Sequence, residues 1–414
     1  MKTTKHIFAF FTFLFVFLVI FSPETFALYL DSPSLGYAID LPDDFRMTDS
    51  NGFDSYQFSS ELLPVEILLC TYQPGKAKNC EKIVNELVYK LNGACDSETF
   101  TWRNRDCAVA QTALVLGSQN YLGWAAAAEL PYQKGYVAML GFYPENDRQA
   151  DICENHIISA IDSLCTDLGA KYQSGIFTSF AYPALGDEEI EVTIAENKIS
   201  AMIDKNDAEA SEYLIQREFD ILVLENNNGF GQAACQRFYK MVFRDSYKRL
   251  RRFSFAVQNA LTFGENPVKS QRELVQTLLT WTQNFEYVRD NNNSDFTPLV
   301  KLINGNGGDC DSRAILLAVM LRQMNLDTAF FVSSKYSHAL LGVQIEGNGA
   351  KIKADGQLDC PVNRDTAERV LKVAKQLGYR RNNAAASLRS GRSHTIAVIT
   401  SDIFAARAIG VFVL

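Results

Sequence analysis

Alternating apolar and polar positions dominate the first third of the chain. Short runs such as "YAIDLP", "VEILLCTY" and "GYVAMLGFY" alternate in the way that predicts half-buried β-strands. Between and after them, "CEKIVNELVYKL" and "ADICENHIISAIDSL" repeat apolar residues at helical spacing. Residues 28–168 are therefore expected to form an α+β domain, and His156 in the second helical stretch is expected to be a packed or surface histidine.

Residues 169–262 form a middle segment whose pattern changes from strand to helix. "IEVTIAENKISAMI" and "FDILVLE" predict strands, and residues 232–262 predict helix. The basic run "RDSYKRLRR" within that helix is most simply a solvated face, with an anion site as the alternative. An amphipathic helix over 269–287 then leads to the next segment.

A glycine-rich run comes directly before the longest apolar helix pattern, in "NGNGGDCDSRAILLAVMLRQ". Residues 314–321 are apolar without interruption, so this helix is expected to be buried. Asp309 can cap it, and Cys310 would lie in its first turn, where free amides and the helix dipole favour a thiolate. The same amides could bind an oxyanion. The alternative is an ordinary helix start with a core cysteine.

A nucleophilic thiol also needs a base, and His338 is the best-placed histidine. "DTAFFVSS" and "SHALLGVQIEG" predict two strands after the buried helix, and His338 opens the second of them, 28 residues after Cys310. A Cys–His pair would supply both a nucleophile and its general base. The alternative for His338 is a strand histidine with its hydrogen bonds satisfied.

The stretch "GGDCDSRAILLAVMLRQMNLDTAFF…SHALLGV" resembles the core of the transglutaminase-like superfamily, in its bacterial, protease-like branch, over about residues 269–358. The resemblance implies a papain-like core within 263–360, a buried helix packed on an antiparallel sheet, with a Cys-His-Asp triad for acyl transfer or amide hydrolysis. It makes Cys310 the nucleophile and His338 the base. The third member is expected to be Asp359, or else Asp355, which more simply lies in a hairpin turn.

The N-terminal residues 1–27 have the composition of a cleaved signal peptide. A basic start, an apolar run over 7–21 and small residues before Leu28 predict export to the periplasm or the extracellular space. No stable membrane span is expected after cleavage. Six cysteines between residues 70 and 165 fit up to three disulfides in an exported domain, with buried thiols as the alternative.

Residues 361–414 differ in character from the rest of the chain, with nine basic residues against three acidic ones. "TAERVLKVAKQLGY" predicts a helix and "HTIAVITSDIF" a strand. Over about 366–404 this tail resembles a fragment of LacI-type repressors, comprising the last headpiece helix, the hinge helix and the first strand of the effector domain. The preceding helix-turn-helix is absent, so the tail is expected to be a truncated, foreign fragment, and its final "IGVFVL" has no visible partner.

The sequence thus favours an exported α+β thiol enzyme acting on amide bonds of a protein or peptide substrate. The net charge of −8 argues against a nucleic-acid partner, and no metal or organic cofactor is expected, since no paired metal-ligand motif occurs. A non-catalytic exported binding or structural protein with an incomplete triad is the alternative. A DNA-binding regulator fragment is a remote third hypothesis that rests on the tail alone.

Overall fold

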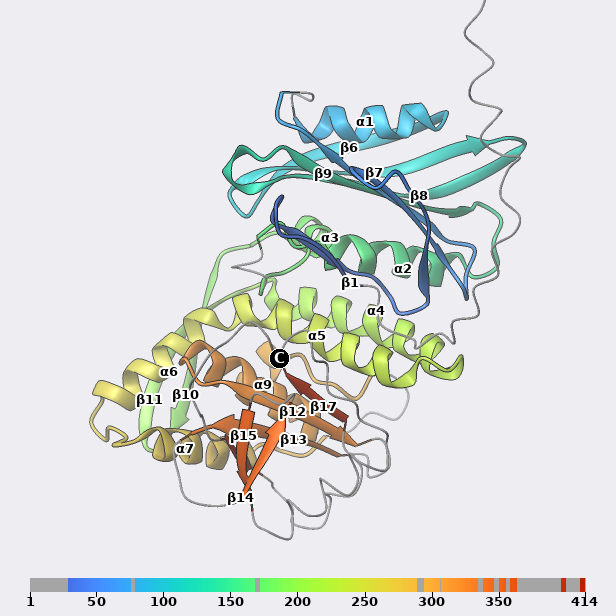
Figure 1. Cartoon of the computed structure of the whole chain (residues 1–414). Helices are drawn as coiled ribbons and strands as arrows, with labels where there is room; N and C mark the ends of the chain where they lie inside the picture. The colour runs from blue at the N-terminus through green and yellow to red at the C-terminus, as the bar shows by residue number, and fades with distance from the viewer. Residues whose placement is uncertain are drawn as a thin grey trace, which may run out of the picture.

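The computed structural model describes residues 29–75, 79–167, 172–288, 294–305, 307–333 and 338–345, together with four short strands over 350–354, 358–362, 396–399 and 410–413. Antiparallel sheets and helices are arranged in layers (Figure 1), which confirms the predicted α+β class. A large sheet lies at the top of the view, long helices lie in the middle, and a smaller sheet with one buried helix lies below. The predicted signal peptide lies outside the described residues.

The large sheet has seven antiparallel strands and a helix on each face. Its strand order is β3 (Phe45–Ser50), β4 (Ser55–Ser60), β5 (Glu66–Tyr72), β9 (Tyr136–Pro144), β8 (Gln119–Glu129), β7 (Arg105–Leu116) and β6 (Gly93–Trp102). Helix α1 (Cys80–Lys90) covers one face, and α2 (Ala150–Ser163) with α3 (Ile176–Ala181) covers the other (Figure 1). The hairpin of β1 (Tyr29–Ser32) and β2 (Tyr37–Asp40) and a short 3₁₀ turn, Pro131–Gln133, complete this part.

Four consecutive alanines in β8 allow both helices to approach the sheet closely. Side chains alternate across a strand, so Ala125 and Ala127 lie in the core under α1, whereas Ala126 and Ala128 lie in the core under α2. Gly141 in β9 serves the same purpose, since a β-carbon there would lie 2.6 Å from the Ile157 Cγ2 atom of α2. The central strands β8 and β9 are therefore buried on both faces over much of their length.

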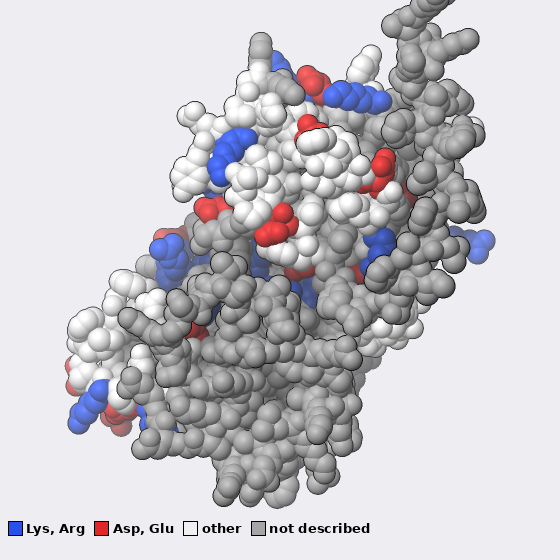
Figure 2. Space-filling view, in the orientation of Figure 1, with Lys and Arg blue, Asp and Glu red and all other residues white. Residues whose placement is uncertain are grey.

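On the side of this sheet that Figure 2 shows, basic and acidic side chains of the described residues are interspersed. No helix in the described part of the chain combines the length and the apolar composition that a membrane span requires.

The middle layer consists of α4 (Asp207–Asn227) and α5 (Gly231–Arg249), followed by α6 (Arg251–Phe263) and α7 (Gln271–Gln283); the hairpin of β10 (Asp187–Ile194) and β11 (Asn197–Asp204) precedes them. The strand predicted for "FDILVLE" is wrong, because these residues belong to α4. Its buried positions Leu214, Glu218, Ile221 and Glu225 follow helical spacing. Two of them are acids, and this concealed the periodicity.

The basic run at 244–252 is not a wholly solvated helix face. The half-buried Arg244 side chain donates hydrogen bonds of 2.6 Å each to the backbone carbonyls of Ser163 and Leu164. Arg249 is also buried and pairs with Asp245 and Asp207. Arginines in this run therefore bind the ends and faces of neighbouring elements.

The lower part of the molecule holds the segment that the sequence marked as a thiol domain. Helix α9 (Cys310–Gln323) packs on a four-stranded antiparallel sheet with the order β16 (Ile396–Ile399), β13 (His338–Gln344), β12 (Thr328–Ser333) and β17 (Gly410–Val413); α8 (Leu299–Ile303) and the hairpin of β14 (Ala350–Ala354) and β15 (Leu358–Val362) lie beside it. All residues from Ala314 to Leu321 are buried, as predicted. They belong to one core that runs from Ile190 to Ile345 and so spans the predicted boundary between residues 262 and 263.

Two strands of this sheet come from the segment that the sequence marked as a foreign tail. β16 pairs with β13, and β17 pairs with β12 through partners such as Phe330 and Phe412. The expectation that "IGVFVL" has no partner is therefore wrong. The helix predicted over 366–379 lies outside the described residues, and the LacI-type resemblance stays a prediction.

The eight cysteines whose side chains the structure describes are free thiols, so the disulfides predicted between residues 70 and 165 are not formed in it. Several of these thiols instead donate to nearby oxygens. Cys80 Sγ lies 3.2 Å from the Asp106 carbonyl oxygen, Cys95 Sγ 3.0 Å from Asn85 Oδ1, and Cys165 Sγ 3.2 Å from the Asp167 carbonyl oxygen.

Candidate functional site around Cys310

Cys310 occupies the first position of α9, and Asp309 is the N-cap, as predicted. The Asp309 carboxylate accepts a hydrogen bond of 2.9 Å from the Ser312 amide and one of 2.7 Å from the Ser312 hydroxyl. Ser312 Oγ in turn accepts a bond of 2.8 Å from the Thr297 amide. The start of the helix is thus fixed to the segment that precedes α8.

Glycine is required where the loop approaches α9. At Gly307 a β-carbon would lie 2.4 Å from Val288 Cγ2 and 2.6 Å from the carbonyl oxygen of Glu286. The next residue, Gly308, donates its amide to that same carbonyl at 2.9 Å. Arg313 fastens the loop from the helix side by donating to the carbonyl of Gly308 at 3.0 Å. This close packing explains the glycine-rich approach to the cysteine.

Three groups define the surroundings of the Cys310 thiol. Sγ donates to Asp311 Oδ1 at 3.0 Å, and the backbone amide of Ala339 donates to Sγ. The other carboxylate oxygen of Asp311 accepts a hydrogen bond from the Tyr239 hydroxyl on α5. The thiol therefore lies between its own helix and the first residues of β13.

The electrostatics of the site disfavour a resting thiolate. Burial raises the pKa of Cys310 well above its ordinary value, and the charge of Asp311 together with its hydrogen bond to the thiol raises that pKa further. The amide of Ala339 acts in the opposite direction and is outweighed. Burial, and an acid one residue away that opposes the helix dipole, therefore act against the thiolate that the sequence predicts at the helix start. Burial and the same Asp311 raise the pKa of Asp309 to about 7.

His338 lies next to the residue that contacts the thiol. It is the first residue of β13 and is half-buried. The next residue is Ala339, whose backbone N–H donates to the Cys310 thiol. The structure thus brings the histidine strand to the cysteine across the intervening helix and strand. Asp359 lies in β15, opposite Lys353 in the hairpin register, and Asp355 lies outside the described residues. The strand directly after β13 has the sequence AKIKA and carries no acid.

Sequence analysis did not find two of the groups at this site. Asp311 was visible beside Cys310, but its orientation toward Sγ depends on the tertiary fold. Tyr239 comes from another helix, 72 residues earlier in the chain, and no local pattern points to it. One ligand atom each from Asp309, Cys310 and Asp311 lies within 4.8 Å of the others, but the two carboxylates already accept hydrogen bonds from Ser312, Cys310 and Tyr239.

No family model and no curated protein matches the chain. Among solved structures it is similar to a point mutant of the protein Mog1, with 10% identity, a TM-score of 0.27, and coverage of 34% of this chain and 97% of that one. It is also similar to the Saccharomyces cerevisiae Ran-binding protein Mog1p, with 10% identity, a TM-score of 0.27, and coverage of 35% and 98%. A protein from Bacteroides thetaiotaomicron matches with 11% identity, a TM-score of 0.21, and coverage of 56% and 76%. TM-scores this low support no inference about this chain.

Proposed function

We propose that this chain is an exported thiol enzyme of transglutaminase-like architecture, which transfers or hydrolyses acyl groups of protein or peptide amides. Cys310 is the nucleophile and His338 is the base. The observation that carries the proposal is the hydrogen bond from Ala339 to the Cys310 thiol, because it brings the start of β13 to the start of α9. A buried helix with the cysteine in its first turn, packed on an antiparallel sheet, is the arrangement that the resemblance implies.

The protonated thiol determines the form of the mechanism. Because burial and Asp311 keep the proton on Cys310, the proton passes to His338 as sulfur attacks the substrate carbonyl. A C–S bond forms, and the amides of Cys310 and Asp311, which the Asp309 cap does not use, bind the oxyanion. The imidazolium then protonates the leaving amine as the C–N bond breaks. Water or a second amine resolves the thioester and returns the proton to Cys310.

The third triad residue is the open position in this proposal. Asp359 on β15 is the candidate that would orient the imidazole, and it would act as a positioning residue. Replacing Asp359 with Asn should lower kcat and shift the pH profile of kcat. It should not change the rate at which Cys310 is alkylated in the absence of substrate.

A non-catalytic binding protein is the second candidate, and one observation favours it. An acid hydrogen-bonded to the thiol, as Asp311 is to Cys310, makes that thiol a poor nucleophile at rest. In this alternative the thiol is a structural group at the helix start.

Acylation of the full-length chain by an activated ester distinguishes the enzyme from the binding protein. Intact mass and peptide mapping measure the acylation. If the chain is an enzyme, the wild type should be acylated at Cys310, and Cys310→Ser should show no acylation at that position. His338→Ala should be acylated about 10²–10⁴-fold more slowly than the wild type. Cys235→Ser is the matched control, since this thiol is also half-buried near Asp311 and should not affect the reaction. An unchanged rate in His338→Ala would overturn the enzyme proposal and leave the binding protein.

A further inference from the structure

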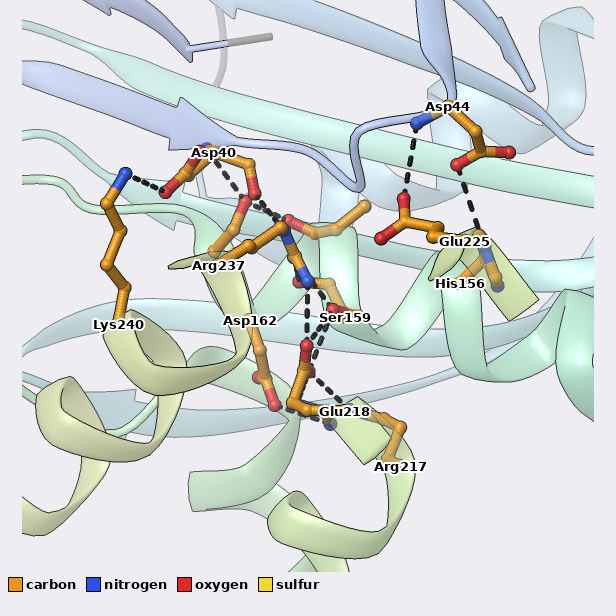
Figure 3. Close-up of polar contacts among 12 residues, drawn as sticks. Asp40, Asp44, His156, Ser159, Asp162, Arg217, Glu218, Glu225, Arg237 and Lys240 are labelled. Atoms are coloured by element: carbon orange, nitrogen blue, oxygen red, sulfur yellow. Dashed lines mark hydrogen bonds and ion pairs between the residues drawn. The ribbon is translucent and has the colours of Figure 1, made fainter. Parts of the chain in front are cut away.

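Three buried metal-ligating side chains meet where the seven-stranded sheet joins the helical layer (Figure 3). Asp44 comes from the segment between β2 and β3, His156 from α2 and Glu225 from α4. Their exposed fractions are 0% for His156 and Asp44 and 1% for Glu225. One ligand atom from each residue lies within 4.8 Å of the other two.

His156 is held in the orientation of a metal ligand. Its Nδ1 lies 3.0 Å from the Ile152 carbonyl oxygen, an acceptor, so Nδ1 carries the proton and donates it. Nε2 then presents a lone pair toward Asp44 Oδ1 at 3.6 Å, and neither atom has a hydrogen-bond partner. The other oxygen of Asp44 accepts a bond from the Ser60 hydroxyl. Metal-binding histidines are commonly fixed by a hydrogen bond at the opposite ring nitrogen in this way.

The carboxyl groups at the cluster are only partly balanced by positive charge, from Arg237 and, at Asp43, also from Lys240. Burial and the neighbouring Asp43 raise the pKa of Glu225 to about 8, and burial raises the pKa of Asp43 to about 6. Both carboxylate oxygens of Asp43 are buried without a hydrogen bond. Burial lowers the pKa of His156, against the opposing effect of Asp44, so its ring is neutral. The nearby Arg237 already donates to Glu218, Ser159 and the Asp40 carbonyl.

We propose that Asp44, His156 and Glu225 bind a divalent transition-metal ion, with zinc as the best-matched probe. One imidazole with two carboxylates is a donor set that zinc accepts. Ligand bonds of about 2.0 Å in a tetrahedral site separate the ligand atoms by about 3.3 Å, close to the 3.6 Å between Nε2 and Oδ1. Asp43 adds negative charge beside the ion.

The ion would fasten three elements that are distant in the sequence. The amide of Asp44 already donates to Glu225 Oε1 at 3.2 Å, across 181 residues of sequence. A metal bound there would connect the large sheet and α2 to the C-terminal end of α4.

Zinc titration of the full-length chain, stripped of metal by a chelator, tests the proposal. Metal analysis should find one ion per chain, and the melting temperature should rise with zinc. Glu225→Gln should abolish both effects and still fold, because its amide oxygen can accept from the Asp44 amide. Glu209→Gln is the matched control, since it makes the same exchange at an exposed position of the same helix.

Free thiols elsewhere in the chain also bind zinc, so cobalt is the second probe. A site of nitrogen and oxygen ligands gives visible cobalt bands without the near-ultraviolet charge-transfer band of thiolate ligation. Uptake that persists in Glu225→Gln, or that shows thiolate bands, would assign the metal to other groups and overturn the proposal. An absence of uptake by the wild-type chain would do the same.

Discussion

At the scale of single residues, Asp311 acts together with burial to keep the proton on Cys310. The carboxylate accepts the thiol proton in a hydrogen bond of 3.0 Å, and it is itself fixed by the Tyr239 hydroxyl. Its negative charge in a partly buried site stabilises the thiol against ionisation. A thiol held in this way resists oxidation and alkylation.

Replacing Asp311 with Asn should make Cys310 more reactive toward iodoacetamide at pH 8. Asn removes the charge but keeps an oxygen for Tyr239, so the pKa of Cys310 falls toward its ordinary value. Each unit of that fall raises the thiolate fraction about tenfold. Peptide mapping of alkylated Cys310 over a pH series measures the change.

The control for this experiment is Glu286→Gln, which neutralises an exposed acid in the loop before the site. It should leave the alkylation profile of Cys310 unchanged. Equal rates for Asp311→Asn and the wild type would show that Asp311 does not control the thiol.

At the scale of the element, the start of α9 depends on a cap that is itself buried. Asp309 satisfies the Ser312 amide, yet burial and Asp311 raise its pKa to about 7 from an ordinary 3.8. Between about pH 4 and pH 7, Asp309 is therefore protonated in the folded state and ionised in the unfolded state. Folding stability contributed by this group is greatest below about pH 4 and declines as the pH rises toward 7.

Exchanging Asp309 for Asn should therefore remove this part of the pH dependence. Asn is a good N-cap and cannot ionise. The difference in the free energy of unfolding between the variant and the wild type should therefore change in favour of the variant from pH 4 to pH 7, and it should stay constant above pH 7. Urea denaturation at several pH values measures the difference.

Asp309→Ala serves as the contrasting variant in the same series. It loses the cap and should lose about 1 kcal/mol even at low pH, where the charge plays no part. Parallel curves for the wild type and Asp309→Asn would show that the carboxyl does not titrate in this range.

The elements that the sequence predicted well are those whose burial is simple. Helix α9 is apolar throughout 314–321, and β12 and β13 follow from short apolar runs bounded by polar residues. The strand predicted within α4 was wrong because Glu218 and Glu225 are buried, whereas an acidic position in a sequence pattern is taken as solvent-facing. The solvated face predicted around Arg244 was wrong for a similar reason, because the side chain of Arg244 donates to backbone carbonyls at the end of α2.

At the scale of the whole molecule, a buried ionic network joins the large sheet with α2 to the helical layer (Figure 3). Glu218 on α4 accepts from Arg217 at 2.8 Å, from Arg237 at 2.7 Å and from the Ser159 hydroxyl at 2.8 Å. Arg217 also reaches Asp162 on α2 at 2.8 Å. Burial raises the pKa of Glu218, but the two arginines outweigh it and hold the pKa below its ordinary value.

Glu218→Gln should destabilise the protein by about 3–5 kcal/mol, because it leaves buried guanidinium groups without their counter-charge. Glu212→Gln is the matched control on the same helix. Its side chain is 61% exposed and pairs with Lys301 at the surface, so its loss should cost less than about 1 kcal/mol. Chemical denaturation of both variants measures the two costs, and equal costs would contradict a stabilising role for the buried network.

Residue pairs were predictable only where one local motif placed both members. The sequence places Cys310 and His338 in a single helix and strand unit, 28 residues apart. The structure packs α9 on β13, and the Cys310–His338 pair itself stays a prediction. The cluster of Asp44, His156 and Glu225 draws on three elements spread over 181 residues, and each residue alone has an ordinary context. The sequence accordingly predicts a packed or surface histidine at position 156 and no metal site.

The pairing of β16 and β17 with β13 and β12 has a consequence for the order of events during synthesis. Both central strands have emerged by Ile345, but β17 is complete only at Val413. At about 5–20 residues per second, the ribosome needs roughly 3 to 14 seconds to make the chain between these points. Throughout that interval the outer backbone edge of β12 has no strand beside it, and the outer edge of β13 has none until β16 is complete at Ile399. Such edges readily pair with other chains. The nascent protein is therefore most exposed to aggregation just before its last strands arrive.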